Sequence, residues 1–347
     1  KHFRLITRGS GKIGKQPMIG ERYILLFNGN IINSSALARK YFITDSESDT
    51  EVLANLIEKI GPKIISELNG FFAIVVFDTL YNEWILARDR LGIKPLFFSN
   101  EIDSLSFASR ADVLAKLLQK DINKEKLLST LKYGSVFMNE TIYDNIEQVP
   151  PGEIISWQSN QFFKKKSYWN VDDLLSKNKE KNNQDEINYL IKNSVESNLI
   201  TKRDCGILFS GGVDSLAVTL SYKNLIKSNQ RLYGFNITNF ESADIMKLGN
   251  ELFLNNYFTN PPLQEINYGN DVFDLPFDDT SSNLCLQIYD KASEKVAVCL
   301  TGDGADEIFG GYSCFRNSSK LNLDNKILKN LKELILNEKI IDKTSIK

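Results

Sequence analysis

Short apolar runs separated by turn residues occupy residues 1–115, and they predict strands around one helix. Four runs are rich in β-branched and aromatic residues, and they are Tyr23–Phe27, Phe71–Phe77, Trp84–Ala87 and Leu105–Ala108. Within Ser48–Gly61, apolar side chains recur three and four positions apart, which is the spacing of one helical face. Ser48 and Glu51 have the spacing of a capping box, so we expect the helix to begin there. This part of the chain is therefore predicted to be α+β.

The pattern changes in the second half of the chain. Residues 150–168 predict a turn and a hairpin, and the charged segment Ser176–Gln184 has almost no apolar residues, which is typical of a surface near a domain boundary. From about Glu186, helical stretches alternate with short apolar runs. The clearest of these runs are Cys205–Phe209, Leu232–Ile237 and Val296–Leu300. This order predicts a doubly wound parallel sheet, whose ligands bind outside the carboxyl ends of the strands.

Composition excludes several classes of protein. The formal net charge of −2 offers no general attraction to nucleic acid or to an anionic membrane, and no apolar stretch could span a bilayer. We interpret Lys164–Lys166 as a solvated surface turn, and the single histidine, His2, argues against a His-based triad. The four cysteines lack C-x-x-C spacing, and Cys205 and Cys299 stand in apolar runs, as buried free thiols do. We therefore expect a cytoplasmic protein that binds neither nucleic acid nor membrane.

The segment Leu208–Ser215 (LFSGGVDS) is the most informative motif, because it joins an apolar strand to a helical stretch through a glycine turn. Its two glycines let the backbone approach a bulky anion, and its serine hydroxyls and backbone amides lie at a helix N-terminus. Asp214 adds a carboxylate that suits Mg²⁺. The Gly-Lys-Ser/Thr ending of a Walker loop is absent. The motif therefore predicts a phosphate site of another class.

The segment Leu300–Tyr312 (LTGDGADEIFGGY) is the second motif. It places three acids, Asp303, Asp306 and Glu307, among four glycines after an apolar strand. A solvated acidic loop is the plain alternative. Both motifs follow strands of the predicted parallel sheet, so we expect them to converge on one crevice.

The two motifs together closely resemble the synthetase domain of the asparagine synthetase family. The Ser-Gly-Gly turn by itself resembles the pyrophosphate loop of ATP pyrophosphatases, which cleave ATP between its α and β phosphates. Five segments of the first half resemble the family's glutaminase domain in the same order: Phe27–Ile31, Ser48–Val52, Leu68–Ala73, Arg88–Leu96 and Val149–Gly152. The resemblance runs from about Phe3 to Tyr312.

This resemblance implies two domains. Residues 1–168 would form an N-terminal-nucleophile hydrolase domain, an α-β-β-α sandwich, and residues 185–347 a doubly wound ATP-pyrophosphatase domain. The family's sequence begins earlier and continues further, so we expect an N-terminal segment and a C-terminal part beyond the printed residues. The family's nucleophilic cysteine is expected upstream, and its catalytic lysine cannot be placed on the tail Lys320–Lys347.

The resemblance also implies a glutamine site. Arg4 would hold the glutamine carboxylate, Asn28 and Gly29 would stabilise the oxyanion, and Asp49 would pair with the glutamine ammonium. Asn30 stands where the family carries a glutamate that also binds the ammonium. A neutral amide accepts a hydrogen bond but gives up the charge pairing. Weaker use of glutamine is therefore expected.

For the second domain, the resemblance implies ATP as substrate and Mg²⁺ as cofactor. The matching ATP-binding positions are Leu208, Ser210, Gly211, Gly212, Asp214, Ser215, Ile237, Thr301 and Gly302. Asp214 and Asp306 are the candidate metal ligands, since Mg²⁺ prefers a few carboxylates with phosphate oxygens and waters. Asp303 is a candidate catalytic residue near the reacting acyl group, and Ser281 and Ser282 are weaker candidates on the substrate side.

The implied function is a glutamine-dependent, AMP-forming amidotransferase that acts through an acyl-adenylate. The acceptor is a carboxylate, with aspartate as the family default; a sugar carboxylate or a natural-product precursor stays open, as does a homodimer. One alternative is a β-lactam or other amide synthetase with an inactive first domain, which Asn30 favours. Another is a non-catalytic nucleotide-binding scaffold, which the intact glycine turn and Asp306 disfavour.

Overall fold

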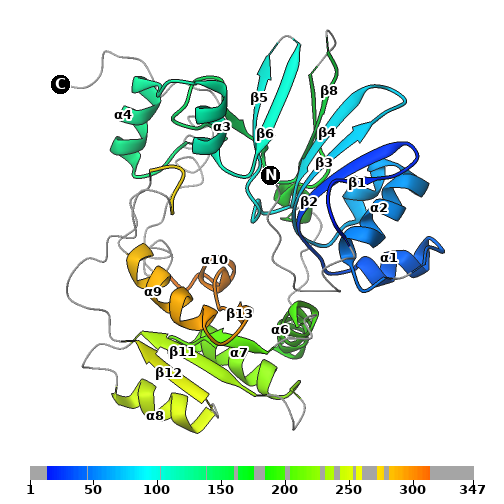
Figure 1. Ribbon diagram of the computed structural model, residues 1–347. Coiled ribbons are helices and arrows are strands. Elements are labelled where there is room, and N and C mark those ends of the chain that lie inside the picture. The colour runs from blue at the N-terminus through cyan, green and yellow to red at the C-terminus, as the bar shows by residue number, and fades with distance from the viewer. Residues whose placement is uncertain are drawn as a thin grey trace.

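The computed structural model shows an N-terminal part built on antiparallel sheets and a C-terminal part built on a parallel sheet (Figure 1). The structure describes residues 14–44, 46–101, 103–137, 139–159, 163–175, 184–199, 204–226, 231–237, 243–252, 255–259, 272–276 and 281–312. The helices α5 (Val171–Leu175) and α6 (Gln184–Asn198) lie between the two parts in sequence.

The larger sheet of the N-terminal part has six strands, each antiparallel to its neighbours. In spatial order they are β1 (Met18–Ile19), β2 (Tyr23–Ile31), β3 (Gly70–Asp78), β4 (Glu83–Arg88), β8 (Glu153–Trp157) and β9 (Lys164–Ser167). The first three predicted strands and the predicted hairpin are confirmed. Lys164–Lys166 lie in β9 instead of a turn, because exposed lysines suit an edge strand that must avoid further pairing.

A second sheet and flanking helices complete four layers. The second sheet has the order β6 (Ser104–Ala108), β5 (Phe97–Glu101), β7 (Glu147–Gln148), and it confirms the fourth predicted strand. The helices are α1 (Ser34–Lys40), α2 (Asp49–Ile60), the 3₁₀ helix η1 (Pro62–Glu67), α3 (Ala111–Leu118) and α4 (Lys124–Tyr133). The first three pack on the larger sheet, and α3 packs on the second sheet. The predicted α-β-β-α sandwich is confirmed.

Alternation along β3 explains why this strand lies between two cores. Phe72, Ile74 and Val76 pack toward α1 and α2, whereas Ala73 and Val75 pack toward the second sheet. Successive side chains of a strand point to opposite faces, so a strand covered on both faces must be apolar throughout. That requirement accounts for the unbroken apolar run in the sequence.

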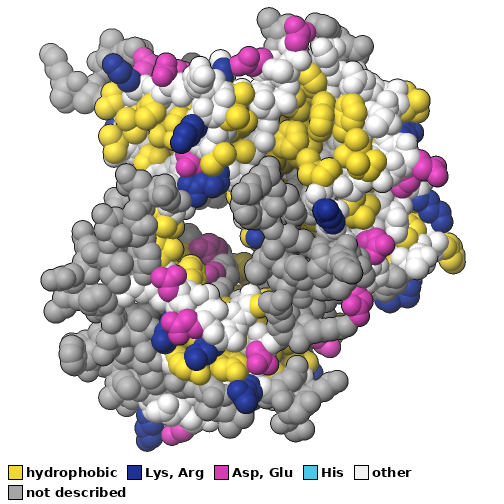
Figure 2. Space-filling view, viewed as in Figure 1, with side chains coloured by type: hydrophobic (Ala, Val, Ile, Leu, Met, Phe, Trp, Pro, Cys, Tyr) yellow, Lys and Arg dark blue, Asp and Glu magenta, His cyan; other side chains and the backbone are white. Residues whose placement is uncertain are grey.

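The outer surface of α3 and α4 keeps large apolar side chains in solvent (Figure 2). They include Val113, Leu117, Leu128 and Leu131, each more than half exposed. The inner face of α3 is buried through Ala111, Leu114 and Ala115. The apolar residues of α3 therefore occupy both of its faces, and only one of them serves the described core.

The predicted capping box at α2 is wrong in its bonding, although the helix begins where expected. Ser48 is the residue before the helix, but its hydroxyl is buried and makes no side-chain cap bond. Glu51 instead accepts a hydrogen bond from Ser46 Oγ, and Ser46 Oγ also accepts from Ser48 N. Ser46 Oγ therefore lies between the Ser48 amide and the Glu51 carboxylate, two groups that would bond directly in a capping box.

The segment Arg88–Leu96 forms a turn organised around a buried carboxylate. Asp89 is 1% exposed, and its two oxygens accept four backbone hydrogen bonds. The donors are Phe72 and Lys94 to Oδ2 and Leu91 and Ile93 to Oδ1, at 3.0–3.1 Å. Arg88 donates to the carbonyl oxygens of Gly92, Lys94 and Val149. This pair fixes the loop to β3, which is a structural role.

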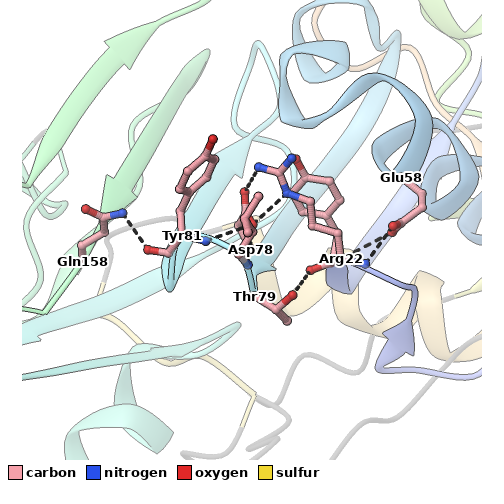
Figure 3. A network of polar contacts seen from close by, with 8 residues as sticks. Arg22, Glu58, Asp78, Thr79, Tyr81 and Gln158 are labelled. Atoms are coloured by element: carbon pink, nitrogen blue, oxygen red, sulfur yellow. Dashed lines mark hydrogen bonds and ion pairs between the residues drawn. The ribbon is translucent and has the colours of Figure 1, made fainter.

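A polar network closes the other end of the larger sheet (Figure 3). Arg22 binds Asp78 through two hydrogen bonds of 3.0 and 2.7 Å, and its backbone N–H donates to Glu58 Oε1 at 2.8 Å. Burial alone would raise the pKa of Asp78. The hydrogen bonds from Arg22 and from the backbone amides of Leu80 and Tyr81 outweigh burial and hold that pKa below its usual range.

We expect Asp78 to contribute to the acid sensitivity of the fold. Because its folded pKa lies below its unfolded value, its stabilisation is present above about pH 4 and is lost as the pH falls through the folded pKa. Asp78→Asn should lower stability at pH 7 and flatten the stability profile below about pH 4. Urea unfolding followed by tryptophan fluorescence measures this, with the exposed Asp103→Asn as control. Parallel acid profiles for Asp78→Asn and the control would contradict it.

The C-terminal part is a four-stranded parallel sheet with helices on both faces. Its strands are β10 (Cys205–Leu208), β11 (Tyr233–Ile237), β12 (Asn255–Thr259) and β13 (Val298–Leu300), in the order β12-β11-β10-β13. The helices are α7 (Val213–Lys223), α8 (Ala243–Leu252), α9 (Ser282–Ser293) and α10 (Ala305–Phe309). Residues of α6, α7 and α8 share one core, and α9 packs in another. The predicted doubly wound sheet is confirmed.

The two cysteines predicted in strands lie in β10 and β13, and both are free thiols. Burial raises the pKa of Cys205 to about 12 and that of Cys299 to about 11, so both thiols stay protonated and unreactive at neutral pH. Within the described ranges, no helix is long and apolar enough to cross a membrane. The strand β12 was not predicted from the sequence, because it opens with two asparagines instead of an apolar run.

Candidate functional site

The order of the parallel sheet places the two glycine-rich motifs side by side. The chain runs from β10 through β11 to β12 toward one edge, then returns to set β13 on the other side of β10. Ligands of doubly wound sheets bind at such a reversal, outside the carboxyl ends of the strands. The glycine turn follows β10 and the acidic loop follows β13. Both motifs therefore meet at the reversal point, as expected.

The glycine turn is held by its two serine hydroxyls. Ser215 is buried, and its Oγ donates to Gly212 O at 3.0 Å and lies 3.1 Å from Ser210 Oγ. Gly212 N donates to Ser210 Oγ at 3.3 Å. The first intrahelical bond of α7 runs from Leu216 N to Gly212 O, so the N–H groups just before it have no acceptor within the helix. This arrangement presents amides and a helix dipole to an anion.

Gly302 brings the acidic loop into contact with the glycine turn. A Cβ atom at Gly302 would lie 3.0 Å from Ser215 N and 3.1 Å from Asp214 Cβ. At Gly211, where φ is +79°, a Cβ atom would lie 2.8 Å from Ile245 of α8. A larger residue at either position would push these segments apart. The two glycines therefore set the spacing at which both motifs can contact one ligand.

The acids of the second motif have different surroundings. Asp303 is exposed, and its N–H donates to Thr301 Oγ1 at 3.3 Å. Asp306 is half-buried in the first turn of α10, with Gly311 packed against its carboxylate. Glu307 accepts a hydrogen bond from Tyr312 Oη at 2.8 Å. Among the three acids, Asp306 is therefore the least exposed, and its carboxylate is held by the contact with Gly311.

The acids of the two motifs suit a metal ion that takes most of its ligands from phosphate oxygens and waters. No cluster of three or more His, Cys, Asp or Glu that could hold a metal ion occurs in the described part of the chain. Asp214 and Asp306 stand in the first turns of α7 and α10, which follow adjacent strands. Two carboxylates with phosphate oxygens and waters fit the preferences of Mg²⁺.

The glutamine-site candidates of the first part lie at the end of β2. Asn28, Gly29 and Asn30 pair with Ala73, Phe72 and Phe71 of β3. Gly29 has φ +147°, and a Cβ atom there would lie 2.0 Å from Phe71 O. Only glycine fits this approach of the two strands. The tight pairing fixes the direction of the neighbouring backbone groups.

Asp49 joins this strand end from the first turn of α2. It is 6% exposed, and its Oδ2 accepts a hydrogen bond from Ile31 N at 3.0 Å, while Oδ1 accepts from Thr50 N at 2.9 Å. Because Ile31 follows Asn30 directly, this bond brings Asp49 to the strand end that carries Asn30. The roles of both residues in binding an ammonium group stay a prediction.

Asn30 offers a buried acceptor at the same place. Its Oδ1 is inaccessible to solvent and has no hydrogen-bond partner among the described residues. A buried oxygen without a donor costs free energy, so this position is suited to receive a donor from a ligand. The ammonium group of an amino acid is such a donor.

Two predicted positions are not fully described. Arg4 lies outside the described residues, as does the side chain of Ile237, which ends β11. Leu208 ends β10, next to the glycine turn, while Ser281 immediately precedes α9 and Ser282 begins it. The sequence analysis did not identify Ile245, which lies against Gly211. An isoleucine in an apolar helix gives no sign in the sequence that it contacts this turn.

Comparison with known families agrees with this division of the chain. Residues 1–169 match the glutamine amidotransferase domain, and residues 186–347 match asparagine synthase. The chain belongs to the asparagine synthetase family. Its doubly wound part thus carries the family's synthase domain, and its four-layered part carries the amidotransferase domain.

Curated relatives of the asparagine synthetase family align with most of this chain. The chain is 28% identical to asparagine synthetase [glutamine-hydrolyzing] 1 of Bacillus subtilis (strain 168), over 96% of this chain and 55% of that protein. It is 27% identical to a putative asparagine synthetase [glutamine-hydrolyzing] 2 of Methanocaldococcus jannaschii, over 89% of this chain and 62% of that protein. The chain therefore spans about half to three fifths of the length of these relatives.

Among solved structures, glutamine phosphoribosylpyrophosphate amidotransferase from B. subtilis, complexed with ADP and GMP, is similar to this chain. The identity is 16% and the TM-score 0.33, over 86% of this chain and 75% of that one. At this TM-score, the fold description rests on the strand order and layers given above.

Proposed function

We propose that this chain is an ATP-dependent, AMP-forming amidotransferase that moves glutamine-derived ammonia onto a carboxylate, with aspartate as the first acceptor to test. Its domains would be residues 1–168, which bind glutamine, and residues 185–347, which bind ATP. The observation that carries the proposal is the contact of Gly302 with Asp214 and Ser215 at the reversal point of the sheet. It joins an anion-binding helix start to an acidic loop, which is the combination that pyrophosphate departure requires.

In the proposed reaction, an acceptor carboxylate oxygen bonds to the α-phosphorus of ATP while the α–β bridging bond breaks. The glycine turn, with Ser210 and Ser215, would bind the departing pyrophosphate through backbone N–H and hydroxyl groups. Mg²⁺, held by Asp214 and Asp306, would supply positive charge against the phosphate oxygens. Ammonia then attacks the acyl carbon, and AMP leaves. Leu208, Ile237 and Thr301 would line the adenosine, and Asp303 would lie near the acyl group.

The reaction class is tested by product analysis. With ATP, Mg²⁺, aspartate and ammonium chloride, the proposal expects AMP and pyrophosphate in equal amounts. ADP and orthophosphate as the products would overturn it. A turnover of ATP that requires a different carboxylate would retain the reaction class and change the acceptor.

For the glutamine half, we propose that Arg4, Asn28, Gly29, Asn30 and Asp49 bind glutamine and that an N-terminal cysteine of the mature protein hydrolyses it. Support comes from the buried Asp49 carboxylate, which binds the backbone of Ile31, and from the buried side-chain oxygen of the preceding Asn30. A glutamine-mimicking alkylator should add mass to the first residue of the native protein. A native N-terminus other than cysteine would favour the amide-synthetase alternative, in which the first domain is inactive.

Asn30→Glu is expected to improve glutamine use. In the proposed pocket, a carboxylate at position 30 adds one charge-assisted contact to the ammonium, which is worth about 1–2 kcal/mol or about 5- to 30-fold in the KM for glutamine. Synthesis from ammonium chloride should not change, because free ammonia does not use this pocket. Asn100→Glu, at an exposed position of β5, makes the same charge change as control. An unchanged glutamine KM, or an equal change with ammonia, would remove Asn30 from the pocket.

A further inference from the structure

The segment Val272–Pro276, here called the strap, belongs to the C-terminal part in sequence but contacts the N-terminal part. It precedes α9, which begins at Ser282. In Figure 1 it is the short gold segment beneath α3. Its hydrogen bonds to the N-terminal part are with the first residue of α3 and the residue before it, more than 150 positions earlier in the chain.

Polar contacts of the strap lie at the start of α3. Asp274 Oδ2 accepts a hydrogen bond from Ala111 N at 2.9 Å. Ala111 is the first residue of α3, where the N–H has no acceptor within the helix and the dipole favours a negative charge. Arg110 Nη1 donates to Val272 O at 3.3 Å, and Asp112 holds the same guanidinium at 2.8 and 2.9 Å. The strap thus caps a helix of the other domain.

An apolar contact adjoins this cap. Leu275 packs against the buried cluster of α3 and the second sheet, which consists of Phe97, Ala111, Leu114, Ala115 and Ile146. The surroundings are partly desolvated: burial, followed by the charges of Asp112 and Asp274, raises the pKa of the neighbouring Tyr143. A hydrogen bond to a carboxylate is stronger in such a place than in open solvent.

The other end of the strap leads to the parallel sheet. The helix α9 packs Ile288 and Ala292 against Tyr233 and Phe235 of β11, next to β10. The strand β13 follows α9 directly in the chain. The strap is therefore joined along the chain, through α9, to the strands that flank the reversal point of the sheet.

We infer that the strap couples the two domains energetically, with Asp274 and Leu275 as its positioning residues. Ligand binding at the β10–β13 edge then stabilises the amidotransferase domain, and glutamine binding affects the synthase domain by the same factor. The ligand half of this inference rests on the proposed function; the docking half rests on the contacts alone.

Tryptophan fluorescence tests the docking half in the full chain, because all three tryptophans, Trp84, Trp157 and Trp169, lie in the amidotransferase domain. Asp274→Ala should lower the midpoint of thermal unfolding that tryptophan fluorescence reports by about 2–4 °C, the effect of one lost helix cap. Asp274→Asn keeps an oxygen acceptor at the start of α3, so its unfolding midpoint should lie close to that of the wild type. Asp290→Ala, at an exposed position of α9, is the control. Equal midpoints for Asp274→Ala and the control would overturn the inference.

Addition of ATP with Mg²⁺ tests the ligand half. The fluorescence midpoint should rise in the wild type and in Asp290→Ala, and should rise by less than half as much in Leu275→Ala. An equal rise in all three proteins would overturn the coupling. If ATP fails to bind the wild type in equilibrium dialysis, the proposed function fails, while the ligand-free comparison still decides whether the strap docks the domains.

Discussion

Asp214→Asn is expected to lower the rate of AMP and pyrophosphate formation by about 10²-fold or more while leaving the fold intact. The carboxylate stands in the first turn of α7, beside Gly302 and the amides of the glycine turn. Its proposed role is to hold Mg²⁺ against the departing pyrophosphate, and removal of such a preorganised electrostatic partner typically costs this much. Asparagine is nearly isosteric and is tolerated at a helix start, so stability should change little.

The assay uses ammonium chloride in place of glutamine, which separates the synthase step from glutamine hydrolysis. Asp290→Asn makes the same chemical change at an exposed position of the same domain and should keep wild-type turnover. Circular dichroism and the thermal midpoint confirm that the variant is folded. Turnover of Asp214→Asn equal to that of the control would remove this residue from the site.

Asp89→Asn is expected to be the most destabilising of these changes, by about 2–4 kcal/mol. The carboxylate is 1% exposed and accepts four backbone N–H bonds. An amide keeps one acceptor oxygen and turns an NH₂ group toward donors on the other side. Each lost bond to a charged acceptor costs about 1.5–3 kcal/mol, part of which water recovers at the exposed edge of the loop.

Urea unfolding measures this effect, since the tryptophans report on the same domain. Asp103→Asn, at an exposed turn, should change the free energy of unfolding by less than about 0.5 kcal/mol. Asp89→Ala removes both acceptor oxygens without placing an NH₂ group against the backbone N–H donors. Comparison of the two variants shows whether the lost acceptors or the donor–donor repulsion causes most of the destabilisation. A loss below about 1 kcal/mol for both Asp89 variants would show that the loop is held by Arg88 alone.

Local pattern was enough for most elements of the fold. The apolar run Phe71–Phe77, rich in β-branched and aromatic residues, predicted β3, and the helical spacing within Ser48–Gly61 predicted α2, because these signals arise from contacts that each element makes with the core. The prediction of a capping box between Ser48 and Glu51 was wrong. Glu51 binds Ser46 instead, and this contact depends on how the turn before the helix folds. The strand β12 was not predicted, because it pairs with β11 without forming an apolar run in the sequence.

The sequence by itself determined the family, the two fold classes and the residue types of each motif, because the glycines, serines and acids act within a few positions of one another. Tertiary structure alone decided what lies next to what. It placed Gly302 against Asp214, Asp49 against the backbone of Ile31, and Asp274 at the start of α3. These adjacencies come from strand order, register and domain docking, which depend on the packing of the whole chain, and no local pattern specifies them.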